Sequence, residues 1–527
     1  MMKLLVSDSL SEKGLQILRE VKDLQVDVFE SIPSDKLKAI IKDYDALIIR
    51  SGTKVTREII QDAAKLRVIG RAGVGLDNVD VEAASERGII VMNAPEGNTI
   101  ATAEHTMSLL LALARKIPQG NDSLRRNIWD RKGLTGIELY GKILGIIGLG
   151  RIGTEVAKRS QSFGMKLIAY DPFLSIDKAS KMEIELVSFE DLLRRSDFIT
   201  VHTPLTKETK HLMSTKEFEL MKDGVRVLNC ARGGIIDEKA LEKAIKSGKV
   251  AGAAMDVFEE EPPINNPLLK LEQVIATPHL GASTNEAQVN VAMDIAKQVV
   301  DVLLDRGIRN AVNYPSVDGE VLKVIRPYLK LAESIGALQA QLADGRITYV
   351  KVRYSGETTN YDTSPITVAL VKGLLTPVLG ETVNYVNAQV LAKGRGIKVI
   401  ESKTTEVEEF ANLIATEVKT DKLRSIVEGT LFSKDNPRIV KIDEFYVDAV
   451  PQGYMVITFN RDVPGIIGTI GTILGRNHIN IAGMTFGRRK QGGRAITVLN
   501  VDSPVPDEVL RELSSADNIY DARLITL

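Results

Sequence analysis

The sequence predicts an α/β protein with two doubly wound parallel-sheet domains, the second inserted in the first, followed by two smaller α+β domains. Strand and helix patterns alternate over the first hundred residues and again from 142 to 277, as parallel sheets with crossover helices require. Long helical segments flank the second series, and the pattern changes after Arg306. At roughly 150 residues per domain, the 527 residues leave room for three or four domains.

The first series consists of short β-branched runs separated by helical stretches, with the short connections that such units need. The expected strands are residues 3–7, 25–29, 46–49, 67–69 and 89–92. The expected helices are residues 12–21, 34–42, 56–64 and 81–87. We therefore expect a parallel sheet in this part of the chain.

Two long helices, residues 99–115 and about 285–304, flank the second series. We expect Pro118 to end the first of them. Between them lie six expected strands, at residues 143–147, 166–170, 197–201, 225–229, 250–254 and 273–276. We interpret the helices as crossings, so residues 1–98 and 285–305 form one domain and residues 99–284 form the inserted one.

The C-terminal part divides in two. Residues 310–450 carry mixed signals and several glycines, which is typical of an α+β domain. From 453 to 527 the expected order is strand 454–459, helix 466–476, strands 479–485 and 494–501, helix 506–513 and a last strand. This βαββαβ order matches a ferredoxin-like unit.

Composition excludes several classes of protein. Lys plus Arg is 68 and Asp plus Glu is 69, a net charge of −1, so nothing favours nucleic acid or an anionic membrane as the main partner. The single cysteine, Cys230, excludes an internal disulfide and a multi-cysteine metal site, and we expect no metal. The N-terminus lacks the pattern of a signal peptide, so we expect a cytoplasmic protein.

A glycine-rich turn, Gly148-Leu149-Gly150-Arg151-Ile152-Gly153, follows the strand at 143–147 and opens a helix. Gly148 permits the tight turn, Gly150 lets a pyrophosphate approach, and Gly153 lets helix and strand pack closely. Asp171 ends the next strand, 18 residues beyond Gly153. A carboxylate there accepts hydrogen bonds from ribose hydroxyls and repels a 2′-phosphate, which favours NAD over NADP. The alternative is a glycine turn without a ligand.

Three further side chains follow strands of the second series: Arg232, Glu261 and His279. Ligands bind at the carboxyl ends of such strands, and histidine is the usual group for proton transfer near neutral pH. Spacing cannot select among the adjacent Glu259, Glu260 and Glu261. Of the other histidines, we expect His202 to shape a cofactor pocket and His105 to pack inside its helix.

Over about residues 1–310 these motifs resemble the D-isomer-specific 2-hydroxyacid dehydrogenases, whose domains are Rossmann-like. The resemblance implies that Arg232 binds the substrate carboxylate, that His279 exchanges the proton of the C2 hydroxyl, and that Glu261 orients His279. It selects Glu261 among the three glutamates. The implied NAD contacts are the turn residues Gly148, Gly150, Arg151, Ile152 and Gly153, with Asp171, Thr203, Cys230, Ala231, Arg232, Asp256, His279, Gly281, Ala282 and Val74.

Loops after two strands of the first series carry arginines beside glycines or hydroxyls, which suits binding of carboxylate or phosphate. The expected substrate residues are Arg50, Ser51, Arg71, Gly73, Val74, Gly75, Asn98, Arg232 and His279. Each arginine could instead be an ordinary surface charge. The whole chain resembles the branch of the family with an intervening domain and a C-terminal ACT domain, which implies NAD-dependent oxidation of 3-phospho-D-glycerate to 3-phosphonooxypyruvate, the entry step of L-serine synthesis.

Asp462 and Asn480 match positions at which an ACT domain of this branch binds L-serine. Two positions before Asp462, where that branch has an aromatic residue, this chain has Asn460. Asp462 could instead cap the helix at 466–476. Edges of such sheets pair, so we expect a homo-oligomer, dimer or tetramer, and the loop at 129–132 could reach across a dimer. Two other functions stay open: another D-2-hydroxyacid dehydrogenase, such as a glycerate or hydroxypyruvate reductase, and a cofactor-sensing binding protein on the same fold.

Overall fold

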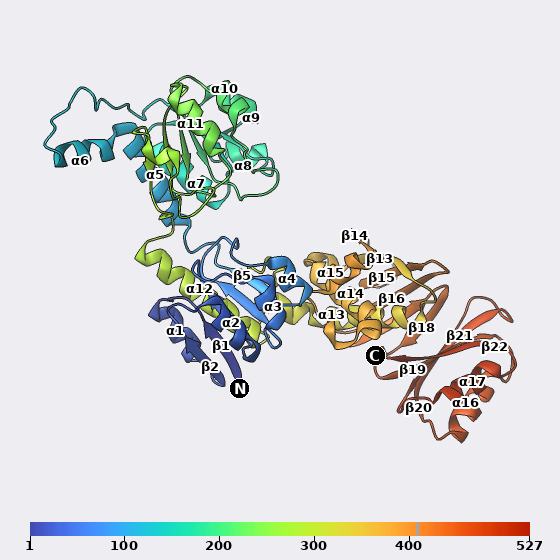
Figure 1. The fold of residues 1–527 in the computed structure, drawn as a ribbon. Helices are drawn as coiled ribbons and strands as arrows, with labels where there is room; N and C mark the ends of the chain where they lie inside the picture. The colour runs from blue at the N-terminus through green and yellow to red at the C-terminus, as the bar shows by residue number, and fades with distance from the viewer. Residues whose placement is uncertain (407–409) are drawn as a thin grey trace.

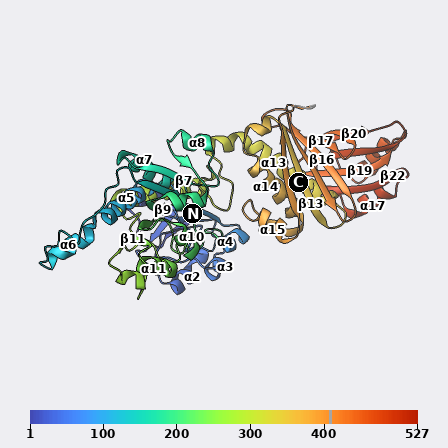
Figure 2. The same ribbon diagram turned by 90° about the horizontal axis from the view of Figure 1, so that it is seen from above.

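The computed structural model describes residues 1–406 and 410–527 and contains two parallel sheets with helices, followed by two α+β units. Figure 1 shows the parallel-sheet units connected by long helices, with the C-terminal units lying in line beyond the first sheet. Figure 2 shows the same succession from above. The predicted fold class is confirmed.

The first sheet has five parallel strands in the order β2-β1-β3-β4-β5. They are β1 (Met2–Val6), β2 (Leu24–Val28), β3 (Ala46–Ile49), β4 (Val68–Arg71) and β5 (Ile90–Asn93). Its helices are α1 (Glu12–Arg19), α2 (Ser34–Ile40), α3 (Arg57–Asp62) and α4 (Val81–Glu86). One hydrophobic cluster joins the sheet to α1 and to the later helix α12 (Asn285–Leu303), and a second joins its other face to α2, α3 and α4.

The second sheet has seven parallel strands in the order β12-β11-β10-β9-β6-β7-β8. They are β6 (Ile143–Ile147), β7 (Lys166–Tyr170), β8 (Glu185–Leu186), β9 (Phe198–Val201), β10 (Val225–Asn229), β11 (Val250–Met255) and β12 (Val274–Ala276). The expectation of six strands was wrong, because β8 is a two-residue edge strand and too short to show alternation. The strand order reverses between β6 and β9, which is where doubly wound sheets bind ligands.

The helices of this unit are α7 (Arg151–Ser162), α8 (Ile176–Ser180), α9 (Phe189–Arg195), α10 (Thr215–Leu220) and α11 (Glu238–Lys246). The chain passes between the two sheets along α5 (Thr99–Arg115) and α12. Pro118 does not end α5: Lys116, with φ of 52°, ends it, and Pro118 lies in the first turn of α6 (Ile117–Arg125). Proline fits there because the first turn has no partner for its missing N–H. Figure 1 shows α6 extending away from the sheet.

The third unit has a mixed six-stranded sheet in the order β14-β13-β15-β16-β17-β18. Its strands are β13 (Ile347–Gly356), β14 (Lys398–Thr404), β15 (Asn412–Thr420), β16 (Arg424–Leu431), β17 (Pro437–Ile442) and β18 (Phe445–Ala449). Its helices are α13 (Gly319–Leu342), α14 (Ser364–Leu379) and α15 (Ala388–Gly394). The segment predicted at 310–450 includes residues 407–409, which lie outside the described residues.

The last unit is an antiparallel sheet in the order β20-β21-β19-β22 with two helices. Its elements are β19 (Tyr454–Arg461), α16 (Ile466–Arg476), β20 (Ile481–Arg488), β21 (Arg494–Val501), α17 (Asp507–Ser515) and β22 (Ile519–Thr526). This is the predicted βαββαβ order. Throughout residues 1–406 and 410–527, every helix is too short or too polar to traverse a lipid bilayer.

Candidate active site

The glycine-rich turn joins β6 to α7 and depends on the absence of side chains. Gly148 has φ of 91°, in the left-handed region that favours glycine. A Cβ at Gly153 would lie 2.2 Å from the carbonyl oxygen of Gly148, so only glycine fits between helix and strand. A Cβ at Gly150 would meet nothing within 4 Å, which leaves open space beside the N-terminus of α7. That space and the free N–H groups fit a pyrophosphate.

Asp171 lies beside this turn. Its Oδ2 accepts a hydrogen bond from the Leu149 N–H at 2.8 Å, and its Oδ1 accepts one from the Phe173 N–H at 2.9 Å. The turn and the carboxylate are therefore held together at the carboxyl ends of β6 and β7. Arg151, the first residue of α7, lies 3.7 Å from Glu96 in the segment leading into α5.

A cleft of about 380 Å³ extends from the turn toward the first sheet's unit. It brings together the predicted cofactor residues Val74, Ile152, Thr203, Cys230, Ala231, Arg232, Asp256, His279, Gly281 and Ala282. It also contains the predicted substrate residues Gly75 and Asn98. The turn residues Gly148, Gly150, Arg151 and Gly153 and the carboxylate of Asp171 are not part of its lining, and neither are Arg50, Ser51, Arg71 and Gly73.

Several polar atoms around the cleft are buried without a hydrogen-bond partner. Within the described part of the chain they include Oδ1 of Asn98, Nδ1 of His202, Oγ1 of Thr203 and Nε of Arg71. Buried polar groups are normally paired, so their gathering here fits a site that receives a polar ligand. Burial lowers the pKa of His202 to about 4, so this imidazole is neutral, and it raises the pKa of the Cys230 thiol to about 12, so this sulfur is no nucleophile at neutral pH.

His279, which lines the cleft, is hydrogen-bonded to Glu261. Nδ1 of His279 lies 2.8 Å from Oε2 of Glu261, and the two side chains are 49 % and 38 % exposed. Oε1 of Glu259 instead lies 3.2 Å from Nε2 of His211. The structure therefore gives a geometric reason, which spacing lacked, to distinguish Glu261 from its neighbours.

Asp256 anchors the loop that carries His279. Its carboxylate accepts hydrogen bonds from the N–H groups of Leu280 at 2.7 Å and Gly281 at 2.8 Å, and from the Thr277 hydroxyl at 2.6 Å. Burial raises the pKa of Asp256, but these bonds and one from His105 outweigh it and lower the pKa, so the carboxylate is ionised. These bonds hold His279 in a left-handed conformation, with φ of 54°.

Arginine side chains converge where the two parallel-sheet units face each other. A Cβ at Gly75 would lie 2.2 Å from Nη2 of Arg232, and a Cβ at Gly73 would lie 1.9 Å from Nη1 of Arg71. Burial, and then the charge of Arg232, lower the pKa of Arg71 to about 10, with a smaller contribution from Arg50. Arg71 therefore remains cationic at neutral pH, and three guanidinium groups near one another suit a ligand with two or three negative charges.

The remaining predicted substrate residues surround this cluster less directly. Arg50 donates from Nη1 to the carbonyl of Ser9 at 3.2 Å, and its N–H bonds Asp8. Ser51 is exposed in the following turn. Asn98 lies at the N-terminus of α5 without capping it. Sequence reasoning missed Asp77, whose Oδ2 lies 3.3 Å from Nε of Arg232. The sequence places Asp77 in the loop 71–78, but it carries no signal that this loop meets Arg232.

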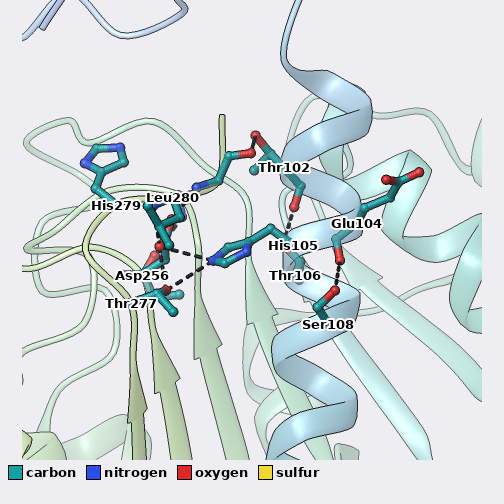
Figure 3. A network of polar contacts seen from close by, with 12 residues as sticks. Thr102, Glu104, His105, Thr106, Ser108, Asp256, Thr277, His279 and Leu280 are labelled. Carbon is teal, nitrogen blue, oxygen red and sulfur yellow. Dashed lines mark hydrogen bonds and ion pairs between the residues drawn. The ribbon is translucent and has the colours of Figure 1, made fainter. Parts of the chain in front are cut away.

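His105 does not merely pack. Its Nε2 lies 3.2 Å from Oδ1 of Asp256 and 3.1 Å from Oγ1 of Thr277. Figure 3 shows this imidazole reaching from α5 to the anchored loop, while the His279 side chain points away from Asp256. A histidine within an apolar helical pattern has no local signal for such a partner.

The two predicted regulatory residues lie in loops of the last unit. Oδ2 of Asp462 accepts hydrogen bonds from Arg488 at 2.9 Å and from the Gly492 N–H at 3.0 Å. Asp462 therefore does not cap α16, which begins after Gly465 without any side-chain cap. Asn480 donates to Asp502 at 2.6 Å.

Comparison with known proteins gives three family matches: the NAD binding domain of D-isomer specific 2-hydroxyacid dehydrogenases at residues 107–281, the D-3-phosphoglycerate dehydrogenase intervening domain at 324–443 and the ACT domain at 454–518. The chain is 47 % identical to D-3-phosphoglycerate dehydrogenase of Methanocaldococcus jannaschii and 44 % identical to that of Bacillus subtilis, over the full length of each.

Among solved structures, the chain is similar to the D-lactate dehydrogenase of Aquifex aeolicus in complex with NAD and lactic acid, with 29 % identity and a TM-score of 0.53. That match covers 60 % of this chain and all of the other. The TT0316 protein of Thermus thermophilus matches at 35 % identity and a TM-score of 0.55, over 59 % of this chain and all of the other.

Proposed function

The chain belongs to the D-3-phosphoglycerate dehydrogenases, a branch of the D-isomer specific 2-hydroxyacid dehydrogenase family, and we propose that it oxidises 3-phospho-D-glycerate to 3-phosphonooxypyruvate with NAD, the first step of L-serine synthesis. The observation that carries the proposal is the His279–Glu261 pair at a cleft lined by Arg232, with the guanidinium group of Arg71 close to that of Arg232. A proton acceptor and a cluster of cations suit an anionic hydroxy acid.

The residues that would hold the cofactor fit it. The turn at Gly148–Gly153 is open beside Gly150, and Asp171 stands where ribose hydroxyls would approach. The unpartnered Thr203 hydroxyl and the neutral His202 face the cleft. NAD, when bound there, supplies the acceptor for the hydride that leaves C2 of the substrate.

The chain's own side chains bind the substrate and move its proton. Arg232 pairs with the carboxylate, and Arg71 and Arg50 attract the phosphate, which orients the substrate. His279 accepts the proton of the C2 hydroxyl at Nε2, because its Nδ1 faces Glu261. Glu261 keeps the imidazole oriented and stabilises the imidazolium that forms. In the reverse direction His279 returns the proton.

Substrate comparison tests this proposal. We expect NADH formation at alkaline pH from 3-phosphoglycerate, with kcat/KM far above that for glycerate, lactate or 2-hydroxyglutarate. Equal values for unphosphorylated acids would favour another 2-hydroxyacid dehydrogenase, and NAD binding without turnover of any of them would favour a cofactor-sensing protein. Asp171→Ala should weaken NAD binding; an unchanged affinity would remove Asp171 from the ribose role.

We also propose that the protein is a homo-oligomer, a dimer or tetramer, acting in the cytoplasm. The segment around α6 carries exposed apolar side chains, Ile117, Leu124, Ile128 and Trp129, as subunit contacts do. Trp129→Ser should lower the mass measured by light scattering. A monomeric wild-type protein would contradict the proposal.

L-serine is the proposed regulatory ligand of the last unit, at Asp462 and Asn480. The ACT domain match supports a regulatory role, while the bonds of Asp462 to Arg488 and of Asn480 to Asp502 show partners that serine would have to replace. Inhibition by serine that Asp462→Ala abolishes would support this. Equal rates with and without serine would contradict it.

A further inference from the structure

The crossing helix α5 is hydrogen-bonded to the loop that carries His279. Oγ1 of Thr102 donates to the carbonyl of Gly281 at 3.1 Å, and one turn later Nε2 of His105 reaches Asp256 and Thr277. Figure 3 shows both side chains leaving the same face of the helix toward the loop. The two contacts span the loop from Thr277 to Gly281, on both sides of His279.

The hydrogen-bond pattern determines where the proton of His105 lies. An ionised carboxylate only accepts hydrogen bonds, so Nε2 must donate to Asp256. The Thr277 hydroxyl donates its own hydrogen to Oδ1 of Asp256, and its oxygen is then free to accept from His105. Nε2–H therefore faces two acceptors, both of which are part of the anchor of the loop.

We propose that His105 is a positioning residue for the reaction: it fixes the Asp256 carboxylate from α5, and Asp256 in turn holds the loop 277–281 so that His279 faces Glu261 and the cleft. This inference rests on the proposed function for its effect on turnover. It explains a strained feature, because the left-handed backbone of His279 persists only where its surroundings hold it. His105 is 19 % exposed and Asp256 is 1 % exposed, so water competes little for this bond.

The contact also relates the loop to the geometry of the two domains. The helix α5 is one of the two segments that connect the sheets. Its hydrogen bonds to the loop therefore keep His279 in a constant position relative to α5. Arg71, by contrast, belongs to the first sheet's unit. The proton acceptor and the arginine proposed to bind the phosphate thus have separate supports, and His105 serves the first of them.

The test uses two variants of similar shape that differ in hydrogen bonding. Gln places an amide N–H near the position of Nε2, whereas Met of similar length donates none. For His105→Met we expect kcat to fall about tenfold, which corresponds to about 1.4 kcal/mol in the barrier, with KM for 3-phosphoglycerate and the Kd of NADH within twofold of wild type. His105→Gln should recover most of kcat. Ser108→Ala is the matched control and should behave as wild type, because Ser108 lies one turn further along α5 and its hydroxyl donates to the Glu104 carbonyl of the same helix.

A second measurement does not depend on turnover. The chain has five histidines, so selective ¹⁵N-histidine labelling gives few signals, and the ¹⁵N signal of His279 Nδ1 reports its contact with Glu261. His105→Met should shift or broaden that signal, and His105→Gln should preserve it. If the Met variant does not fold, His105→Asn, whose amide ends one bond short of the acceptors, replaces it.

The outcomes separate the two proposals. A wild-type protein that forms no NADH from 3-phosphoglycerate contradicts the proposed function, and the His279 signal then decides the role of His105 alone. A folded His105→Met with wild-type kcat and an unchanged His279 signal overturns the inference. So does a Gln variant as impaired as the Met variant, because packing rather than hydrogen bonding would then matter.

Discussion

Replacing Glu261 by glutamine tests the contact between Glu261 and His279. The change keeps the size and the hydrogen-bonding oxygen but removes the negative charge 2.8 Å from Nδ1 of His279. For charge centres roughly 4 Å apart, the attraction between imidazolium and carboxylate is about 1 kcal/mol at the dielectric constant of water and about 4 kcal/mol at an effective value of 20. Both side chains are more than a third exposed, so solvent screening favours the lower part of this range, about 1–2 kcal/mol.

This stabilisation acts when the proton reaches His279, so we expect kcat for oxidation of 3-phosphoglycerate to fall roughly 5- to 30-fold in Glu261→Gln. The Kd of NADH, measured by fluorescence, should stay within twofold. The control is Glu260→Gln, which removes the same charge from the adjacent exposed residue. If the two variants lose equal activity, or if Glu261→Gln keeps a wild-type kcat, the reasoning from the pair is refuted.

Three further changes test other parts of the structure. Gly153→Ala should raise the Kd of NADH at least tenfold and lower the Tm, because its Cβ would lie 2.2 Å from a backbone oxygen. Gly150→Ala should weaken NADH binding at an unchanged Tm, because its Cβ would meet no protein atom within 4 Å. Wild-type NADH affinity in both variants would contradict the role of the turn. Arg71→Met should raise the KM for 3-phosphoglycerate by tenfold or more, since hydrogen bonds to charged groups contribute about 1.5–3 kcal/mol. The KM for NAD should change little. An unaltered KM for 3-phosphoglycerate would show that Arg71 does not contact the phosphate. Burial lowers the pKa of His202 from 6.5 to about 4. Above pH 6.5 this histidine is neutral in the folded and the unfolded state, so the free energy of unfolding is at its full value. As the pH falls to 4, the unfolded state takes up the proton first, and about 3 kcal/mol of the free energy of unfolding is lost. His202→Gln should therefore lose less stability than wild type between pH 7.5 and pH 4.5 in thermal unfolding, and equal losses would be evidence against a buried neutral His202.

Local patterns were sufficient for most elements of this chain. The strands at 143–147, 166–170 and 225–229 and the helices at 99–115 and 466–476 have the predicted bounds, because each has a clear period or a strong boundary signal within its own residues. Predictions failed where the signal was short or ambiguous. The strand β8 has two residues, and Pro118, which can follow one helix or begin another, begins α6.

By itself, the sequence determined the parallel-sheet architecture and the dinucleotide turn. The alternation of strands and helices and the spacing of three glycines are signals that lie within short stretches of the chain. Only the tertiary structure decided which groups meet: Glu261 rather than Glu259 at His279, Asp77 at Arg232, and His105 at Asp256. Along the chain, Glu261 and His279 lie 18 residues apart, Asp77 and Arg232 lie 155 apart, and His105 and Asp256 lie 151 apart. Their distances depend on how strands and the crossing helix pack, and no local pattern carries that information.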